Sequence, residues 1–332
     1  MMAAVSMAQT PTVSASSVTL KYCLTTYGTV HVAVAKSDLF PINYDGFSFS
    51  NFGEYVRKLE NVRGCDSVVT YIVEKNTQGV LSGKFRVNSA GKQVQFAKGN
   101  LMYLASNGIT YPNEGCLSHQ TKTGTAAGIW RFGDEQYSAC GNVTANSSPS
   151  STQTSWMDLF LWGHTGYSSY APTSTSDIPY SNNAGNYDWG YFNAIQNGGN
   201  RPGLWRLLSE DEWTYMMSGR PSASSKYAFV KINNSISGLM ILPDEWTLPS
   251  GCPWSSGNSQ TNYTYAQWQQ MEAAGAVFLI ADYYGSYEIV GNGEETLYFL
   301  TDRSANVSST QVQIKSYRNA YRSHVRLVCD VE

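Results

Sequence analysis

The chain has 332 residues, of which 42% are hydrophobic and only 14% are charged, and its formal net charge is −3. Ordinary soluble domains are roughly 25% charged, so the shortage of Lys and Arg excludes a nucleic-acid-binding footprint, and the shortage of Glu and Lys excludes a coiled coil. The 13% of aromatic residues argues against disorder, and the 23 Tyr residues are typical of a loop-rich, β-leaning protein with a contact surface.

The first segment, residues 1–17, is low in complexity and rich in Ala, Ser and Thr. The first basic residue is Lys21, so the positively charged start of a secretory signal is missing and we expect no signal peptide. A polar arm without its own core is ordered most easily by packing on a partner, so we expect residues 1–17 to join the protein to an assembly. We expect no membrane span, because no apolar run approaches 18 residues.

Strand-like alternation follows the arm. Polar and apolar residues alternate with period two over residues 17–22, 29–34 and 67–73, and residues 64–66 supply a turn before the last of these segments. The pattern predicts a small all-β, sandwich-like domain over residues 18–78.

The remaining chain, residues 79–332, mixes strand and helix signals. Residues 84–87 and 93–96 read as a β-hairpin. Two capping boxes, at residues 209–212 and 264–267, each place Ser or Thr three positions before Glu or Gln and predict two short amphipathic helices. The acidic residues 210–212 fit a helix dipole better than a catalytic pair.

A buried strand is expected directly after the second helix, at residues 275–281. The stretch 171–203 is polar and rich in Gly, Asn and Tyr, so its aromatic side chains must hold it in place. Together these elements predict an α+β domain with an unusual amount of ordered loop.

The six cysteines show no C-x-x-C pair and no zinc spacing. Buried free thiols are the simplest interpretation for a chain of this size. Cys23 and Cys65 form the first pair to test for a disulfide, because both belong to the same small unit.

A series of motifs runs in a specific order through residues 80–329. They are 83–87 (GKFRV), 96–101 (FAKGNL), 130–132 (WRF), 156–163 (WMDLFLWG), 188–190 (DWG), 197–200 (NGGN), 203–209 (GLWRLLS), 212–213 (EW), 238–244 (GLMILPD), 272–279 (EAAGAVFL) and 325–328 (VRLV). This series resembles a large family of Bacteroidetes proteins, from gut bacteria and their phages, with a C-type-lectin-like fold related to formylglycine-generating enzyme. Residues 64–70 (GCDSVVT) resemble the end of a short β-repeat of Bacteroidetes surface proteins.

The resemblance implies binding rather than turnover. Some family members are variable proteins of diversity-generating retroelements, in which a C-terminal segment is mutated to retarget binding. The corresponding segment here is residues 282–324, and residues 322–324 (RSH) depart from the usual Gly and aromatic, as a variable patch would allow. The ligand-binding residues expected in it are Tyr283, Tyr284, Ser286, Tyr287, Asn292, Tyr298, Asp302, Arg303, Asn306, Tyr317, Arg318, Asn319, Tyr321, Arg322 and His324.

Enzyme and metal alternatives find little support in the sequence. Formylglycine-generating relatives need a reactive cysteine pair near the C-terminal end and a copper cofactor, and Cys329 stands alone there. The Glu-Pro-Asn or Gln-Pro-Asp triplet of calcium-dependent lectins is missing, and residues 242–244 (LPD) do not replace it. Neither a nucleophile elbow nor a metal-binding helix motif is present. We expect no catalytic residue, no metal site and no cofactor.

We therefore expect a non-enzymatic recognition protein with a C-type-lectin-like domain. The leading hypothesis is a phage virion component, a head fibre or tail-associated receptor-binding protein, that contacts a host-cell surface glycan or protein. It would be a homo-oligomer, a trimer being one option, held in its assembly by the N-terminal arm. The alternative is a bacterial cell-surface or fimbrial adhesin, and the third hypothesis is an oxidase of the formylglycine-generating type.

Overall fold

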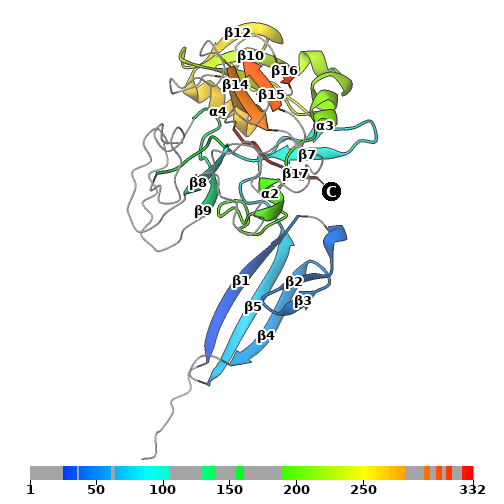
Figure 1. Ribbon diagram of the computed structural model, residues 1–332, viewed down its shortest axis with the longest axis vertical. Helices are drawn as coiled ribbons and strands as arrows, with labels where there is room; N and C mark the ends of the chain where they lie inside the picture. The colour runs from blue at the N-terminus through cyan, green and yellow to red at the C-terminus, as the bar shows by residue number, and fades with distance from the viewer. Residues whose placement is uncertain are drawn as a thin grey trace, which may run out of the picture. The chain divides into compact units, whose positions relative to one another are not determined.

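The computed structural model is rich in β-sheet and poor in helix (Figure 1). It describes residues 25–35, 37–60, 64–104, 129–138, 155–160, 188–281, 295–299, 304–308, 312–315 and 324–331. Contacts divide the chain into two compact units. The smaller unit comprises residues 1–31 and 53–72, and the larger comprises residues 32–52 and 73–332.

The described strands of the smaller unit belong to a three-stranded sheet, and the last residues of two of these strands are assigned to the larger unit. Its strand order is β1 (Thr26–Val34), β5 (Asp66–Lys75) and β4 (Gly53–Glu60), so β5 lies in the middle. The strands expected at 29–34 and 67–73 are confirmed, whereas the one expected at 17–22 lies outside the described residues. Among the described residues of the smaller unit only Cys65 and Tyr71 are buried, and the sandwich expected over residues 18–78 stays a prediction.

The hairpin of β2 (Ile42–Tyr44) and β3 (Phe47–Phe49) belongs to the larger unit. It follows the short 3-10 helix Ser37–Leu39. The guanidinium of Arg201 donates a hydrogen bond to the Ala33 carbonyl and lies over the Tyr44 ring. These contacts explain why residues 32–52 group with the larger unit, although the sequence predicts one continuous domain over residues 18–78.

A four-stranded sheet carries the main hydrophobic cluster of the larger unit. Its strand order is β12 (Gly257–Tyr263), β10 (Tyr227–Ile232), β11 (Ile236–Ile241) and β13 (Val277–Ile280). All four residues of β13 are buried, which confirms the predicted buried strand. A continuous apolar run suits a strand covered on both faces.

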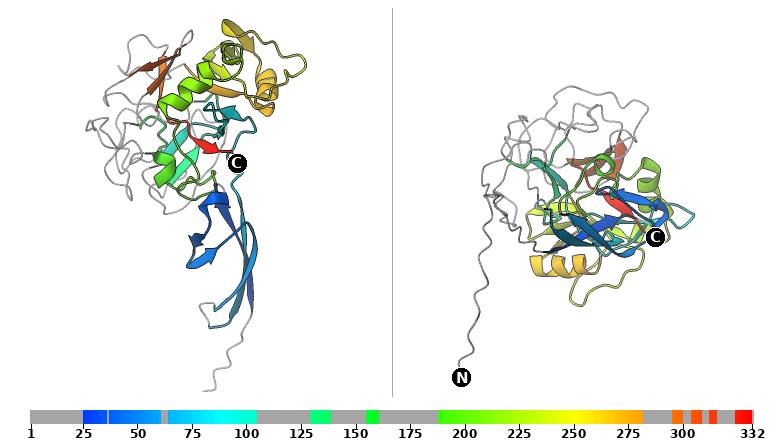
Figure 2. Two further views of the ribbon diagram at one scale, coloured as in Figure 1. Left: turned by 90° about the vertical axis from the view of Figure 1, so that its right-hand side faces the viewer. Right: turned by 90° about the horizontal axis from the view of Figure 1, so that it is seen from below.

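The chain end returns to the start of the larger unit. Strand β17 (Val328–Asp330) pairs antiparallel with β7 (Gln93–Phe96), which in turn pairs with β6 (Phe85–Arg86). Figure 2 shows the red β17 beside the cyan β7. The predicted hairpin is therefore confirmed. A separate pair is formed by β8 (Leu101–Leu104) and β9 (Ile129–Phe132).

Two helices begin at the predicted capping boxes. Ser209 caps α3 (Glu210–Thr214) and Thr264 caps α4 (Tyr265–Ala273), with both reciprocal hydrogen bonds present in each box. Three further short elements are not predicted from the sequence. They are the one-turn helix α2 (Trp189–Phe192), the π-helix Tyr215–Gly219 that extends α3, and the 3-10 helix Ala223–Ser225.

The tryptophans of the quoted motifs are mostly core residues, as large aromatic side chains would be. Trp156, Trp205, Trp213 and Trp268 are buried, while Trp246 and Trp254 pack partly buried against the main hydrophobic cluster. Trp162, in the motif at residues 156–163, lies outside the described residues.

Candidate functional site

The described strands of the expected binding segment form a small antiparallel sheet. It consists of β14 (Glu295–Phe299), β15 (Ser304–Ser308) and β16 (Val312–Lys315), with β15 in the middle. Strand β15 contacts β11 of the four-stranded sheet, and the two sheets lie together in Figure 1. The segment is therefore built against the main core.

Most of the predicted ligand-binding residues cannot be placed. Those that lie outside the described residues are Tyr283, Tyr284, Ser286, Tyr287, Asn292, Asp302, Arg303, Tyr317, Arg318, Asn319, Tyr321 and Arg322. Asn306 is part of β15, directly opposite Gln313 of β16.

Tyr298 and His324 do not belong to an exposed surface, contrary to the prediction. Each is only 2% exposed. A parallel bridge joins their backbones, and their ring centroids are 5.6 Å apart. The Tyr298 hydroxyl donates a hydrogen bond to the Ile280 carbonyl at 3.3 Å, and burial raises the pKa of this hydroxyl to about 12. The pair forms the base of the segment, because it connects β14 to the end of β13.

The imidazole of His324 contacts Asp158 in the core. Its Nδ1 lies 3.1 Å from the Asp158 carbonyl oxygen and 3.9 Å from a carboxylate oxygen of the same residue. Burial lowers the pKa of His324, although the negative charge of Asp158 acts in the opposite direction. The imidazole is therefore neutral at pH 7.

Two residues further along the chain, Arg326 occupies the centre of a buried polar network. Its Nε donates to Asn100 Oδ1 at 2.9 Å, and its Nη1 donates to Gln136 Oε1 and the Ala97 carbonyl, both at 3.2 Å. Its Nη2 donates to the Phe278 carbonyl at 3.2 Å. Burial lowers the pKa of Arg326 to about 10, so the side chain remains a cation at neutral pH.

Gln136 extends this network to helix α4. Its Nε2 donates to Glu272 Oε1 at 2.7 Å, and its Oε1 accepts from the Phe278 backbone N–H at 2.9 Å. Burial raises the pKa of Glu272. A single chain of polar contacts therefore connects α4, β13 and Arg326, which lies two residues before β17. Buried polar networks make a scaffold rigid when their groups are paired, and in this one Asn100 Nδ2 has no hydrogen-bond partner among the described residues.

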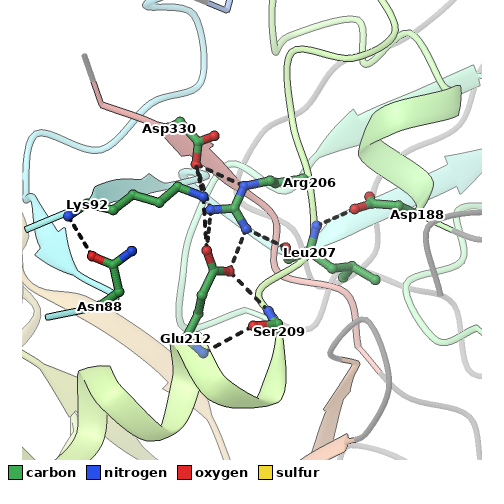
Figure 3. Close-up of polar contacts among 8 residues, drawn as sticks. All are labelled: Asn88, Lys92, Asp188, Arg206, Leu207, Ser209, Glu212 and Asp330. Atoms are coloured by element: carbon green, nitrogen blue, oxygen red, sulfur yellow. Dashed lines mark hydrogen bonds and ion pairs between the residues drawn. The ribbon is translucent and has the colours of Figure 1, made fainter. Parts of the chain in front are cut away.

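A second, more accessible ionic cluster connects β17 to the start of α3 (Figure 3). Arg206 donates hydrogen bonds to both carboxylate oxygens of Glu212, at 2.6 and 2.8 Å. Its Nη2 also donates a hydrogen bond of 2.6 Å to Asp330 Oδ1. Lys92 Nζ adds a contact of 3.1 Å to Glu212 and one of 3.4 Å to Asp330. Two cations balance two carboxylates, so the cluster leaves no formal charge for a ligand.

Asp188 stands beside this cluster in Figure 3 but faces backbone groups. Its carboxylate accepts from Gly190 N and Tyr191 N, which caps α2, and from Leu207 N at 2.8 Å. Burial raises the pKa of Asp188 to about 6, although these backbone hydrogen bonds and Arg206 oppose the shift. The residue anchors the polar stretch before residue 203 to the core.

The cysteines and titratable groups show no assembled catalytic centre in the part of the chain that is described. Cys252 and Cys329 are free and buried, as expected, and burial raises the pKa of the Cys329 thiol to about 11. Cys65, one of the two cysteines named above as the first pair to test for a disulfide, is disulfide-bonded. Among the described residues, no three His, Cys, Asp or Glu side chains gather in a metal-binding arrangement, and no helix is long and apolar enough to span a membrane.

Comparisons with protein-family models, curated proteins and solved structures find no match to this chain. The geometry is therefore the main guide to function. Sequence reasoning missed Arg326, Gln136 and Asp158 as the base of the candidate site. Only the position of Arg326 between apolar neighbours, in the motif at residues 325–328, could have indicated a buried cation.

Proposed function

We propose that this protein is a non-enzymatic recognition protein whose larger unit is a C-type-lectin-like α+β domain. In this proposal, residues 282–323 form the binding segment. The single observation that carries the proposal is that this part of the chain is fixed to the core at its two ends and at one point between them: Ala281, Tyr298 and His324 are buried. Chain segments that a rigid scaffold holds in place commonly carry binding function.

The buried base favours a binding role for the segment over a folding role. Tyr298, His324 and Arg326 hold the base through contacts to residues far away in the sequence. In this proposal the other Tyr, Asn and Arg residues of the segment supply the contact surface. Tyr and Arg dominate the energetics of protein interfaces, which suits them to a recognition surface.

The partner that we propose is a glycan or protein of a host-cell surface, and the particle is a phage virion. A head fibre or a tail-associated protein would display such a segment in many copies. The support for this step is the resemblance of the motifs to proteins of gut Bacteroidetes and their phages. The expected N-terminal arm, residues 1–17, would attach the protein to the virion.

The disulfide of Cys65 favours a second candidate, an adhesin of the bacterial cell surface. Disulfides persist in oxidising environments, outside the cytosol. An exported surface or fimbrial protein would acquire such a bond on its way out of the cell, whereas a phage protein would acquire it after release.

A formylglycine-generating activity receives no support from the described cysteines. Cys329 is buried, its thiol pKa is raised to about 11, and a protonated thiol is a poor nucleophile and metal ligand. Cys252 is also buried and contacts the Gln267 carbonyl rather than a second cysteine.

The binding segment can be tested by tyrosine replacement. A variant with Tyr283, Tyr287, Tyr317 and Tyr321 changed to Ala should keep its thermal unfolding profile and lose attachment to host cells. The matched control is Tyr191→Ala, because Tyr191 is 59% exposed and lies outside the segment. Attachment that survives the fourfold change but fails in the control would reject the segment as the binding surface.

Mass spectrometry of purified phage particles from a Bacteroidetes host tests the location. A stoichiometric copy number in the particle would support a virion component. Detection only in the envelope fraction of the host would support the bacterial adhesin instead.

A further inference from the structure

Among the described residues of the smaller unit, one edge strand carries neither charged residues nor proline. In the sheet order β1-β5-β4, the two outer strands of the described residues are β1 and β4 (Figure 1). An outer strand presents a row of backbone N–H and C=O groups to which another strand can pair. Natural proteins block such pairing with charged residues or proline on the edge.

The two edges differ sharply in charge. Strand β4 carries Glu54, Arg57, Lys58 and Glu60 within eight residues. Residues 26–31 of β1 (TYGTVH) contain no Asp, Glu, Lys, Arg or Pro. They are also open to solvent: Tyr27 is 79% exposed, and Thr29 is exposed too. Only β4 therefore has the usual protection of an edge strand.

Gly28 lies in the middle of the unprotected edge. A Cβ atom built at this position would meet no atom within 4 Å. Glycine weakens a strand, and inside a strand it often marks a place where another backbone approaches closely. Nothing within the described chain makes such an approach, so the open space at Gly28 suits a second strand.

We propose that residues 26–31 pair with the same residues of a second copy of this chain. The pairing is antiparallel, with a two-fold axis near Gly28, and it joins two three-stranded sheets into one of six strands. Tyr27 then lies opposite Thr29 or Val30 of the partner subunit, and pairs of an aromatic with a β-branched residue are favourable across strands. This inference concerns assembly, so it does not depend on the proposed binding segment.

The charges of β4 disfavour a second copy there in the register that is centred on Arg57. Two-fold pairing of β4 about Arg57 would set Arg57 against Arg57 of the partner subunit and Glu54 against Glu60 of the partner subunit. Like charges directly opposite each other destabilise a sheet. The same operation on β1 opposes no charged side chains. The smaller unit also gains from the extension, because only Cys65 and Tyr71 are buried among its described residues and so small a core gives little stability of its own.

The experiment measures the mass of the full-length, oxidised protein by size-exclusion chromatography with light scattering. We expect a dimer. Thr29→Lys places two ammonium groups near the two-fold axis and should raise the dimer dissociation constant about tenfold or more. The matched control is Val56→Lys, an exposed position on the β4 edge, which should remain a dimer. Circular dichroism checks that both variants are folded.

Hydrogen exchange of the amides of residues 26–31 supplies the second measurement. In the wild type these amides should be protected in the dimer and lose protection on dilution. A monomeric wild type with protected amides would show that the chain's own N-terminal residues cover the edge, and it would overturn the proposal. A dimer that withstands Thr29→Lys as well as Val56→Lys, or any assembly that leaves these amides unprotected, would overturn it too.

Discussion

Arg326 is a cation with almost no access to solvent, so its hydrogen bonds decide whether the core tolerates it. Arg326→Met would remove the charge and leave the carbonyls of Ala97 and Phe278 without this donor. Breaking one side of a buried polar network costs about 3–5 kcal/mol. We expect a loss of unfolding free energy of that size, measured by urea denaturation. Arg326→Lys should also destabilise, because a single ammonium cannot span the same acceptors.

The matched control for this change is Arg86→Met. The Arg86 side chain is 48% exposed, and its Nε is 3.9 Å from Asp244, at the limit of an ion pair. Surface changes of this kind usually alter stability by less than about 0.5 kcal/mol. Equal urea midpoints for Arg326→Met and the wild type would contradict the role of Arg326 as the anchor of the binding segment.

The hydrogen bonds between Arg206 and Glu212 stabilise the first turn of helix α3, and their contribution to the free energy of unfolding should depend on pH. Burial alone would raise the pKa of Glu212, but the hydrogen bonds from Arg206 outweigh it and the net pKa is lowered from 4.5. A carboxyl with a lowered pKa stabilises the fold above its unfolded pKa, and the contribution is lost as the pH falls through the folded pKa. Glu212→Gln should therefore cost about 1–2 kcal/mol at pH 7 and progressively less below pH 4.5.

Chemical denaturation at a series of pH values measures this difference. Asp211→Asn is the control, because Asp211 occupies the same first turn and is exposed. It should change stability by less than about 0.5 kcal/mol at any pH. The loss of unfolding free energy caused by Glu212→Gln could instead stay constant down to pH 3, roughly the low end for carboxyl titration. That result would show that the ionic cluster of Figure 3 does not stabilise the helix.

The sequence predicts an element when the signal is local. The capping boxes at Ser209 and Thr264 each lie within four residues, and both helices begin where predicted. Helix α2 has no such box: Asp188 caps it, but the same carboxylate also binds Leu207 N, nineteen residues away. Four residues of helix carry too little periodicity to recognise.

Site residues are harder to predict because their environment comes from distant parts of the chain. Tyr298 and His324 are of residue types that are common on contact surfaces. The bridge between them and their contacts to Ile280 and Asp158 nevertheless place them in the core. Arg326 binds Asn100, which is 226 positions away. Period, charge and spacing within one segment contain no information about such pairings.

At the scale of the whole molecule, the division into two units makes the disulfide of Cys65 informative. The smaller unit consists of residues 1–31 and 53–72, and the only cysteines in these ranges are Cys23 and Cys65. We therefore expect non-reducing peptide mapping to find a bond between Cys23 and Cys65. A cross-link of this kind stabilises by about 2–4 kcal/mol, mainly through the unfolded chain. Reduction should then lower the unfolding temperature of the smaller unit only.

Calorimetry with and without reductant separates the two units. The larger unit contains the free thiols Cys252 and Cys329, and its hydrophobic clusters do not depend on the disulfide. Its transition should stay in place while that of the smaller unit moves to lower temperature. A cross-link from Cys65 to Cys116 or Cys140, which belong to the larger unit, would instead shift both transitions together and would contradict the division into independently stable units.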